Sequence, residues 1–191
     1  MARPILRRSS LTLAAIALSL GIVSGAHADS SGRNLAKFAS GSGNIIYLAA
    51  GLGLPLLRDG DHGGVHTARV ADTLIVTLGL TEGLKAITRE KRPDSDEHNS
   101  FPSGHTSAAF AVATIQSALH PREAALWFGG ATAIGLSRIR LNRHHPQDVL
   151  AGALLGYGVG RWEVSRSRGL VLTPWIHDDA PGMRIVVGNS W

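Results

Sequence analysis

The sequence predicts an all-α fold: a bundle of about five helices after an N-terminal signal, with a small C-terminal β-hairpin. Two observations lead to this class. Five apolar segments rich in Ala, Gly and Leu are bounded by proline, glycine or charged residues, as helices commonly are. In the tail, residues 166–191, aliphatic and β-branched runs at 170–176 and 183–187 flank the turn-forming sequence DDAPG, which favours a hairpin.

Residues 1–28 have the pattern of a secretory signal peptide. Three arginines within the first eight residues precede an apolar run over residues 11–23, and Ala26-His27-Ala28 fits the small-x-small cleavage rule. An uncleaved membrane anchor is the alternative, but the apolar run is shorter than the roughly 20 residues of a membrane span. The polar, Gly/Ser-rich residues 29–43 that follow predict a leader or linker.

The main domain is predicted to cover residues 44–165. Its helices are expected at residues 44–57, 70–88, 103–119, 122–137 and 146–161. The glycines and charges of residues 58–66 predict a loop in which His62 and His66 are solvated. Helices of roughly 14–19 residues are about 21–28 Å long, slightly less than a bilayer core of about 30 Å. Helix length therefore leaves both a soluble and a membrane-embedded bundle open.

The charge of the chain argues against nucleic acid binding, and its lack of cysteine excludes two kinds of covalent or metal site. The chain has 19 basic and 14 acidic residues, and three of the basic residues lie in the predicted signal. The mature chain keeps 16 basic and 14 acidic residues, and this net charge of +2 is too small to indicate nucleic acid binding. The chain contains no cysteine, which excludes disulfides and thiolate metal sites.

Three short strings contain the residues whose side chains could take part in catalysis or ligand binding. They are Lys85 with Arg92-Pro93, then Pro102-Ser103-Gly104-His105, then Ser137-Arg138 with His144 and Asp148. Together they supply three cations, two histidines, a hydroxyl, a helix start and a carboxylate. This set suits an anionic tetrahedral group that is attacked by a histidine.

In the third string, His144 and Asp148 are four residues apart, and Pro146 suits the first turn of a helix. A carboxylate beside one imidazole nitrogen fixes the tautomer and leaves the other nitrogen as a nucleophile. Arg138 can bind phosphate oxygens with its guanidinium fork. A metal site formed by His144, His145 and Asp148 is the alternative, and the lack of a further carboxylate or histidine at ligand spacing counts against it.

The second string is predicted to open a helix, whose N-terminus presents free N–H groups to an anion. Ser103 can cap this helix or donate its hydroxyl to phosphate. Gly104 allows the backbone to approach a ligand closely, and His105 can protonate a leaving oxygen. Lys85 and Arg92 would complete the clamp by neutralising phosphoryl charge.

The spacing of the three strings resembles the signature of the type 2 phosphatidic acid phosphatase superfamily, which includes bacterial acid phosphatases and vanadium haloperoxidases. The resemblance implies that His144 is the nucleophile, that Asp148 orients it and that His105 is the acid for the leaving group. It implies that no metal or other cofactor is needed, and it leaves the role of His145 open. The implied phosphate-binding residues are Lys85, Arg92, Ser103, Gly104 and Arg138.

We therefore expect an exported, metal-independent phosphatase that hydrolyses phosphomonoesters or pyrophosphates through a phosphohistidine. The apolar bundle favours lipid phosphates, and the resemblance suggests undecaprenyl pyrophosphate, phosphatidylglycerol phosphate and lipid A phosphates as candidates. The active site would face the periplasm, with the protein associated with or embedded in the inner membrane. The alternatives are a soluble, broad-specificity periplasmic acid phosphatase, a vanadate-dependent haloperoxidase and a non-catalytic phosphate-binding protein.

Overall fold

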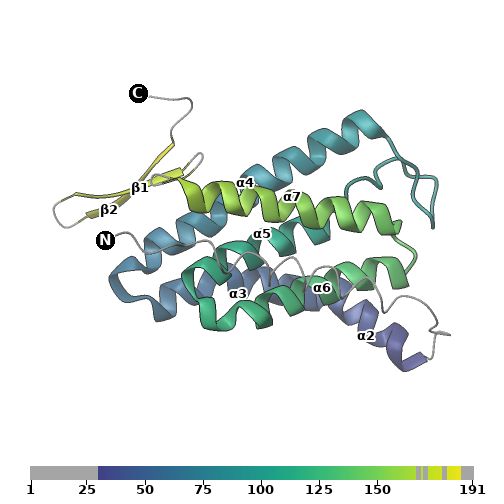
Figure 1. The fold of residues 1–191 in the computed structure, drawn as a ribbon, viewed down its shortest axis with the longest axis horizontal. Coiled ribbons are helices and arrows are strands. Elements are labelled where there is room, and N and C mark those ends of the chain that lie inside the picture. The colour runs from purple at the N-terminus through teal and green to yellow at the C-terminus, as the bar shows by residue number, and fades with distance from the viewer. Residues whose placement is uncertain (1–29, 167–168, 170–171, 178–179, 186–191) are drawn as a thin grey trace, which may run out of the picture.

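Six α-helices form the body of the molecule in a computed structural model that describes residues 30–166, 169, 172–177 and 180–185 (Figure 1). Short 3-10 turns at Gly60–His62 and Pro121–Glu123 precede α4 and α6. The predicted signal, residues 1–28, lies outside the described residues. The helices are α2 (Ser30–Ser40), α3 (Ser42–Arg58), α4 (Gly63–Thr88), α5 (Gly104–Leu119), α6 (Ala124–Arg140) and α7 (Pro146–Ser165).

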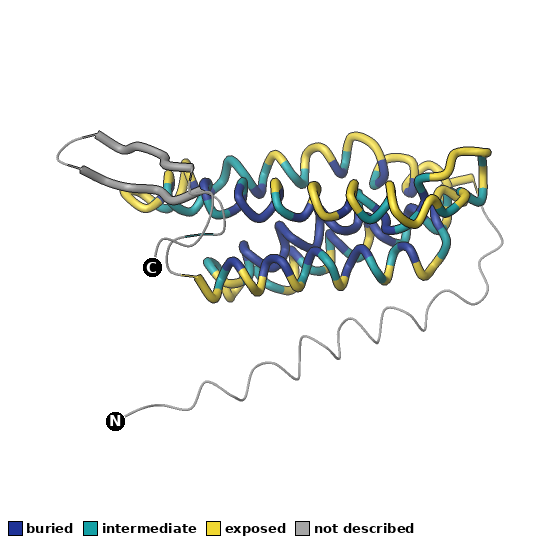
Figure 2. The backbone as a smooth tube through the Cα atoms, turned by 90° about the horizontal axis from the view of Figure 1, so that it is seen from above, coloured by how far each residue is buried: buried dark blue, intermediate teal, exposed yellow. Residues whose placement is uncertain are grey.

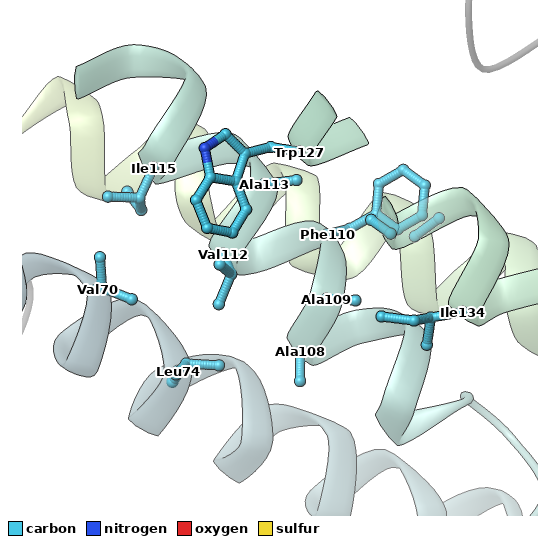
Figure 3. Close-up of a cluster of buried hydrophobic side chains, with 12 residues drawn as sticks. Val70, Leu74, Ala108, Ala109, Phe110, Val112, Ala113, Ile115, Trp127 and Ile134 are labelled. Atoms are coloured by element: carbon cyan, nitrogen blue, oxygen red, sulfur yellow. The ribbon is translucent and has the colours of Figure 1, made fainter. Parts of the chain in front are cut away.

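Helix α5 is the centre of the bundle and contacts α3, α4, α6 and α7. Every residue of α5 from Thr106 to Gln116 is buried, and the buried residues of Figure 2 likewise lie between the helices. Its larger side chains, including Phe110 and Ile115, pack against α4 and α6 (Figure 3). Its many alanines let the neighbouring helices approach it closely.

The closest approach in the bundle joins α5 to α7 along three glycines that are four residues apart. A Cβ atom at Gly152 would lie 2.6 Å from the Ser103 carbonyl oxygen, and one at Gly156 would lie 2.1 Å from the Ser107 carbonyl oxygen. A Cβ atom at Gly160 would lie 2.6 Å from the Cβ of Thr114. Because the contacts advance in the same direction along both helices, α5 and α7 run parallel and start at the same end of the bundle.

A charged cluster holds the opposite end of the bundle, where residues 58–66 were predicted to form a loop. That prediction was wrong for residues 63–66, which form the first turn of α4. Asp59 accounts for the difference, because its Oδ2 lies 2.6 Å from His66 Nδ1 and its Oδ1 lies 3.0 Å from His120 Nε2. Burial disfavours ionisation of Asp59, but these two histidines outweigh it and hold the carboxyl pKa below its usual range.

Residues 30–40 are helical, although their composition predicted a leader or linker. Ala36 and Ser40 lie one helical turn apart and are buried, and α2 packs on α6. Two small residues at this spacing give α2 a narrow face that fits against another helix. Leu35 and Phe38 of the same helix remain more than half exposed.

The predicted fold class needs a correction at the C-terminus. The all-α bundle is confirmed, but a β-hairpin as a second component of the fold is not supported. The described part of the tail contains a pair of six-residue segments, β1 (Leu172–His177) and β2 (Ala180–Ile185), with Leu172 opposite Ile185. The expected second strand at 183–187 was misplaced, because β2 begins within the predicted turn. Two strands alone are marginally stable, and the helices of residues 30–166 form the domain without them.

The glycine contact between α5 and α7 gives a stability prediction. Gly156→Ala should lower the free energy of unfolding by about 1–3 kcal/mol, because the new methyl group meets backbone atoms of α5 that cannot move aside cheaply. Thermal and denaturant unfolding followed by circular dichroism measure the change. Gly158→Ala is the matched control on the same helix, since its Cβ would meet nothing within 4 Å. Equal stability of the two variants would contradict the close contact.

Candidate active site

Four helix ends meet at one end of the bundle and bring the three sequence strings together. Helix α4 ends there after Lys85, and α6 ends there after Arg138, while α5 and α7 begin there. The connections of residues 89–103 and 141–145 complete this end, which lies on the right in Figure 1. The backbone N–H of Ser103 donates to the carbonyl oxygen of Asp148 at 3.0 Å, which ties the starts of α5 and α7 together.

His144 is buried and electrically neutral in this setting. Its side chain is about 2% exposed, and its Nδ1 lies 3.5 Å from Oδ2 of Asp148. Burial, followed by the charges of Arg138 and Arg92, lowers the pKa of His144 to about 4, while Asp148 acts in the opposite direction. At neutral pH the imidazole therefore has a lone pair, and Nε2 is the nitrogen that does not face Asp148.

Asp148 occupies the first turn of α7, where Pro146 is at the helix start. It is fully buried, and its Oδ2 accepts hydrogen bonds from the His145 backbone N–H at 2.9 Å and from Ser100 Oγ at 2.5 Å. Two such donors hold the carboxylate in a fixed orientation.

His105 lies among the three predicted cations. Burial, followed by the charges of Arg138, Lys85 and Arg92, lowers the pKa of His105 to about 4. The influence of all three cations on one imidazole indicates that the predicted phosphate clamp comes together around His105. A Cβ atom at Gly104 would lie 3.3 Å from Lys85 Nζ. The absence of a side chain at Gly104 therefore leaves room beside the backbone for the ammonium group of Lys85.

Ser103 begins α5 but does not cap it with its side chain. Its hydroxyl oxygen instead accepts a hydrogen bond of 3.0 Å from Thr106 Oγ1, and the residue is fully buried. A hydroxyl that accepts from Thr106 can still donate its own proton. Of the two uses that the sequence allowed for Ser103, donation to a bound phosphate fits this arrangement.

The cations are only partly neutralised by the protein. Lys85 Nζ lies 2.7 Å from Oε1 of the exposed Glu82, and Arg92 Nε donates to Asn99 Oδ1 at 2.6 Å. Arg138 is buried, its Nη1 donates to Ser40 Oγ of α2, and its Nε has no hydrogen-bond partner among the described residues. Burial, then the charges of Arg92 and Arg143, lower the pKa of Arg138 to about 10. This concentration of positive charge, with Arg138 buried and Lys85 and Arg92 half-buried, suits an anion.

Three residues beside the site have donor atoms that could hold a metal ion. The ligand atoms of Glu90, His145 and Asp148 lie within 4.8 Å of one another. Glu90 is the further carboxylate whose apparent absence from the sequence counted against a metal, so that part of the prediction was wrong. The same geometry also brings His145 between the two carboxylates without a metal, since its Nδ1 lies 3.5 Å from Glu90 Oε1 and 3.4 Å from Asp148 Oδ2.

Sequence reasoning missed several residues that shape this end of the bundle. Ser40 is far from the strings in sequence, and Glu90 lies between Lys85 and Arg92 within the first string without being one of its specified positions. Ser100 lies only three residues before Ser103, but its role depends on Asp148, which is 48 residues away. His62 and His66 lie at the opposite end of the bundle and take no part in the site.

Comparison with known families agrees with this geometry. A family model described as the PAP2 superfamily matches residues 67–169, more than half of the chain. The chain belongs to the PAP2 superfamily. The resemblance seen in the three strings is thereby confirmed at the level of the family.

Two curated proteins illustrate the similarity within the PAP2 superfamily. A lipid A 1-phosphatase of Porphyromonas gingivalis is 39% identical over 97 residues, which are 48% of this chain and 22% of that protein. The bacitracin transport permease protein BcrC of Bacillus licheniformis is 47% identical over 58 residues, which are 30% of this chain and 29% of that protein. The chain thus matches less than a third of the length of each of these two relatives.

A solved structure supports the PAP2 fold. The crystal structure of Aquifex aeolicus LpxE superposes with a TM-score of 0.59, and the match covers 85% of this chain and 100% of that chain. The two sequences are 23% identical in this match. At this level of identity the similarity concerns the arrangement of the helices.

The cations around His105 predict that anion binding is linked to proton uptake. Orthovanadate or inorganic phosphate should raise the pKa of His105 from about 4 to about 6 or higher, because the bound negative charge offsets that of the cations. NMR titration of the histidine ring protons measures this shift, with His105→Gln used to assign the signal. The His62 signal, from the far end of the bundle, should not respond. An unchanged His105 pKa at saturating anion would contradict a clamp around this residue.

Proposed function

We propose that the protein is a metal-independent phosphatase that acts on phosphate monoesters or diphosphates of membrane lipids through a phosphohistidine at His144. The observation that carries the proposal is the pairing of a buried, neutral His144 with three cations that surround His105. A neutral imidazole is a nucleophile, and clustered cations whose carboxylate partners, such as Glu82 and Glu97, are exposed can bind an anion. Membership of the PAP2 superfamily supports the same reaction class.

In the proposed mechanism, the phosphoryl group binds between Lys85, Arg92 and Arg138, with Ser103 and the start of α5 donating to its oxygens. The Nε2 lone pair of His144 attacks phosphorus, and the bond to the leaving oxygen breaks. His105, protonated in the bound complex, gives its proton to that oxygen. Water then attacks the phosphohistidine and loses a proton to His105, which releases inorganic phosphate and restores neutral His144.

The proposal of a lipid substrate rests on the surface of the N-terminal helices. Among the described residues, the stretch Ser30–Arg58 is long and apolar enough to cross a membrane by length and composition. Large apolar side chains on α2 and α3 are more than half exposed: Leu35, Phe38, Ile45, Ile46, Leu56 and Leu57. Apolar surface of this extent is typical of a protein that contacts lipid. The name of the Porphyromonas gingivalis relative supports a lipid phosphate as the substrate class.

We also propose that the chain is exported and that its active site faces the periplasm. The support is the signal-like sequence of residues 1–28. A soluble periplasmic acid phosphatase would use the same site, and the substrate comparison below separates the two.

Replacement of the nucleophile tests the mechanism. His144→Ala should reduce phosphate release on the order of a thousandfold or more, because the variant lacks the proposed nucleophile and His105 is assigned the separate role of acid. Malachite-green detection of phosphate measures the loss, and circular dichroism checks the fold. The neighbouring His145→Ala is the control and should lose far less activity. Substantial turnover by His144→Ala would rule out the phosphohistidine.

Metal removal distinguishes the proposed metal-independent mechanism from a metal-dependent one. Activity should persist in EDTA and should be inhibited by orthovanadate, since the cationic clamp rather than a metal ion binds the phosphoryl group. Phosphate release before and after EDTA treatment measures this. Loss of activity that Zn²⁺ or Mn²⁺ restores in the wild type, but not in Glu90→Gln, would favour a metal at Glu90, His145 and Asp148 instead.

A comparison of kcat/KM between a lipid substrate and a soluble substrate tests the substrate class. A lipid phosphate in mixed micelles should give kcat/KM at least about tenfold above that of p-nitrophenyl phosphate, because apolar contacts outside the site add binding energy. Phosphate release from purified protein measures both substrates under the same conditions. Equal values, together with release of the protein from membranes by a salt wash, would favour the soluble acid phosphatase.

A further inference from the structure

The proposed nucleophile and its carboxylate lie at the outer limit of a direct contact in the structure. The distance of 3.5 Å between His144 Nδ1 and Asp148 Oδ2 exceeds that of an ordinary N–H···O hydrogen bond, about 2.7–3.2 Å. The hydroxyl of Ser100 lies beside both groups. Its Oγ is 2.5 Å from Asp148 Oδ2 and 3.4 Å from His144 Nδ1.

The protons available to these three groups fix the direction of the contacts. An ionised carboxylate only accepts hydrogen bonds, and a serine hydroxyl has one proton to donate. The distance of 2.5 Å between Ser100 Oγ and Asp148 Oδ2 indicates that Ser100 donates this proton to Asp148. Ser100 then offers His144 two acceptors: its backbone oxygen, whose hydrogen bond raises the pKa of His144, and the remaining lone pairs of Oγ, which lies 3.4 Å from Nδ1. In this arrangement Nδ1 is protonated and Nε2 keeps its lone pair.

We propose that Ser100 is a positioning residue that links Asp148 to His144 and selects the tautomer in which Nε2 is the nucleophile. This inference rests on the proposed phosphohistidine mechanism and assigns to Ser100 a role that the three strings did not indicate. The contact of 3.4 Å is long, as hydrogen bonds between catalytic groups often are before a substrate is bound. A small rotation of the imidazole would shorten it.

The surroundings of Ser100 suit this role. The residue is fully buried, so water does not compete for its hydroxyl. Its backbone N–H donates to the Glu90 carbonyl oxygen at 2.9 Å, which fixes the end of the connection between α4 and α5. The same oxygen of Asp148, Oδ2, also accepts the His145 backbone N–H. The hydroxyl is therefore held against a carboxylate oxygen that a second donor fixes.

Kinetics of Ser100→Ala provide the first test. This variant should lower kcat about ten- to a hundredfold, as expected of a nucleophile that is no longer held in its attacking orientation, with KM for the substrate changed less than about twofold. Ser107→Ala is the matched control, because it also removes a buried serine hydroxyl at this end of α5, one that contacts Thr81 Oγ1 at 2.9 Å. An equal loss of kcat in both variants would assign Ser100 to packing and overturn the proposal.

A double-mutant cycle tests whether Ser100 acts through Asp148. If it does, Ser100→Ala should have little further effect on kcat in an Asp148→Asn background. Losses that multiply would show that the two residues act independently and would overturn the link. Retained activity of His144→Ala would overturn the proposed function itself, which is a separate and distinguishable result.

The tautomer of His144 gives a readout that a purely structural role would not change. In ¹⁵N-histidine-labelled wild-type protein above pH 6, the His144 signals should show protonated Nδ1 and unprotonated Nε2. Ser100→Ala should show a mixture of tautomers, and an unchanged spectrum would overturn the proposal. If Ser100→Ala does not fold, Ser100→Cys carries the same test, because a thiol is of similar size and a weaker donor.

Discussion

The parallel contact between α5 and α7 is the constraint on which the site depends. Three glycines of α7 lie directly against the backbone of α5, and side chains at Gly152 or Gly156 would force the helices apart. Because the helices run parallel at this short distance, their N-termini meet at one end. Two dipoles then point their positive ends at the same region, and the Ser103 N–H reaches the Asp148 carbonyl oxygen. Packing of small residues thus places the proposed acid and the proposed nucleophile together.

The second constraint is electrostatic. Arg138 is buried beside Arg92, and the described residues leave its Nε without a partner. Burial lowers the pKa values of His105, Arg138 and His144, and repulsion between like charges lowers them further. A bound phosphoryl group would offset the repulsion. Burial and the neighbouring cations therefore keep the proposed nucleophile neutral, and the same cations favour an anion.

The sequence predicted the parts of this protein that local patterns determine. Proline and glycine marked the ends of the helices, so most boundaries agree with the structure within a few residues, and the spacing of the strings located the end of the bundle that holds Lys85, His105 and Asp148. Interactions between distant segments were not predictable. Helix α2 looked like a linker because only two small residues hold it against α6. The first turn of α4 depends on Asp59, whose partner His120 lies 61 residues away.

The connection between α4 and α5 shows why such interactions matter for function. It contains Arg92, which belongs to the proposed clamp, and Ser100, which contacts Asp148. Arg92 is held within this connection by Asn99, the residue next to Ser100, and a bound phosphate would compete with Asn99 for the guanidinium. Movement of Arg92 toward a phosphate therefore acts on the backbone that positions Ser100. The proposed anion binding and the proposed orientation of His144 therefore share one structural element.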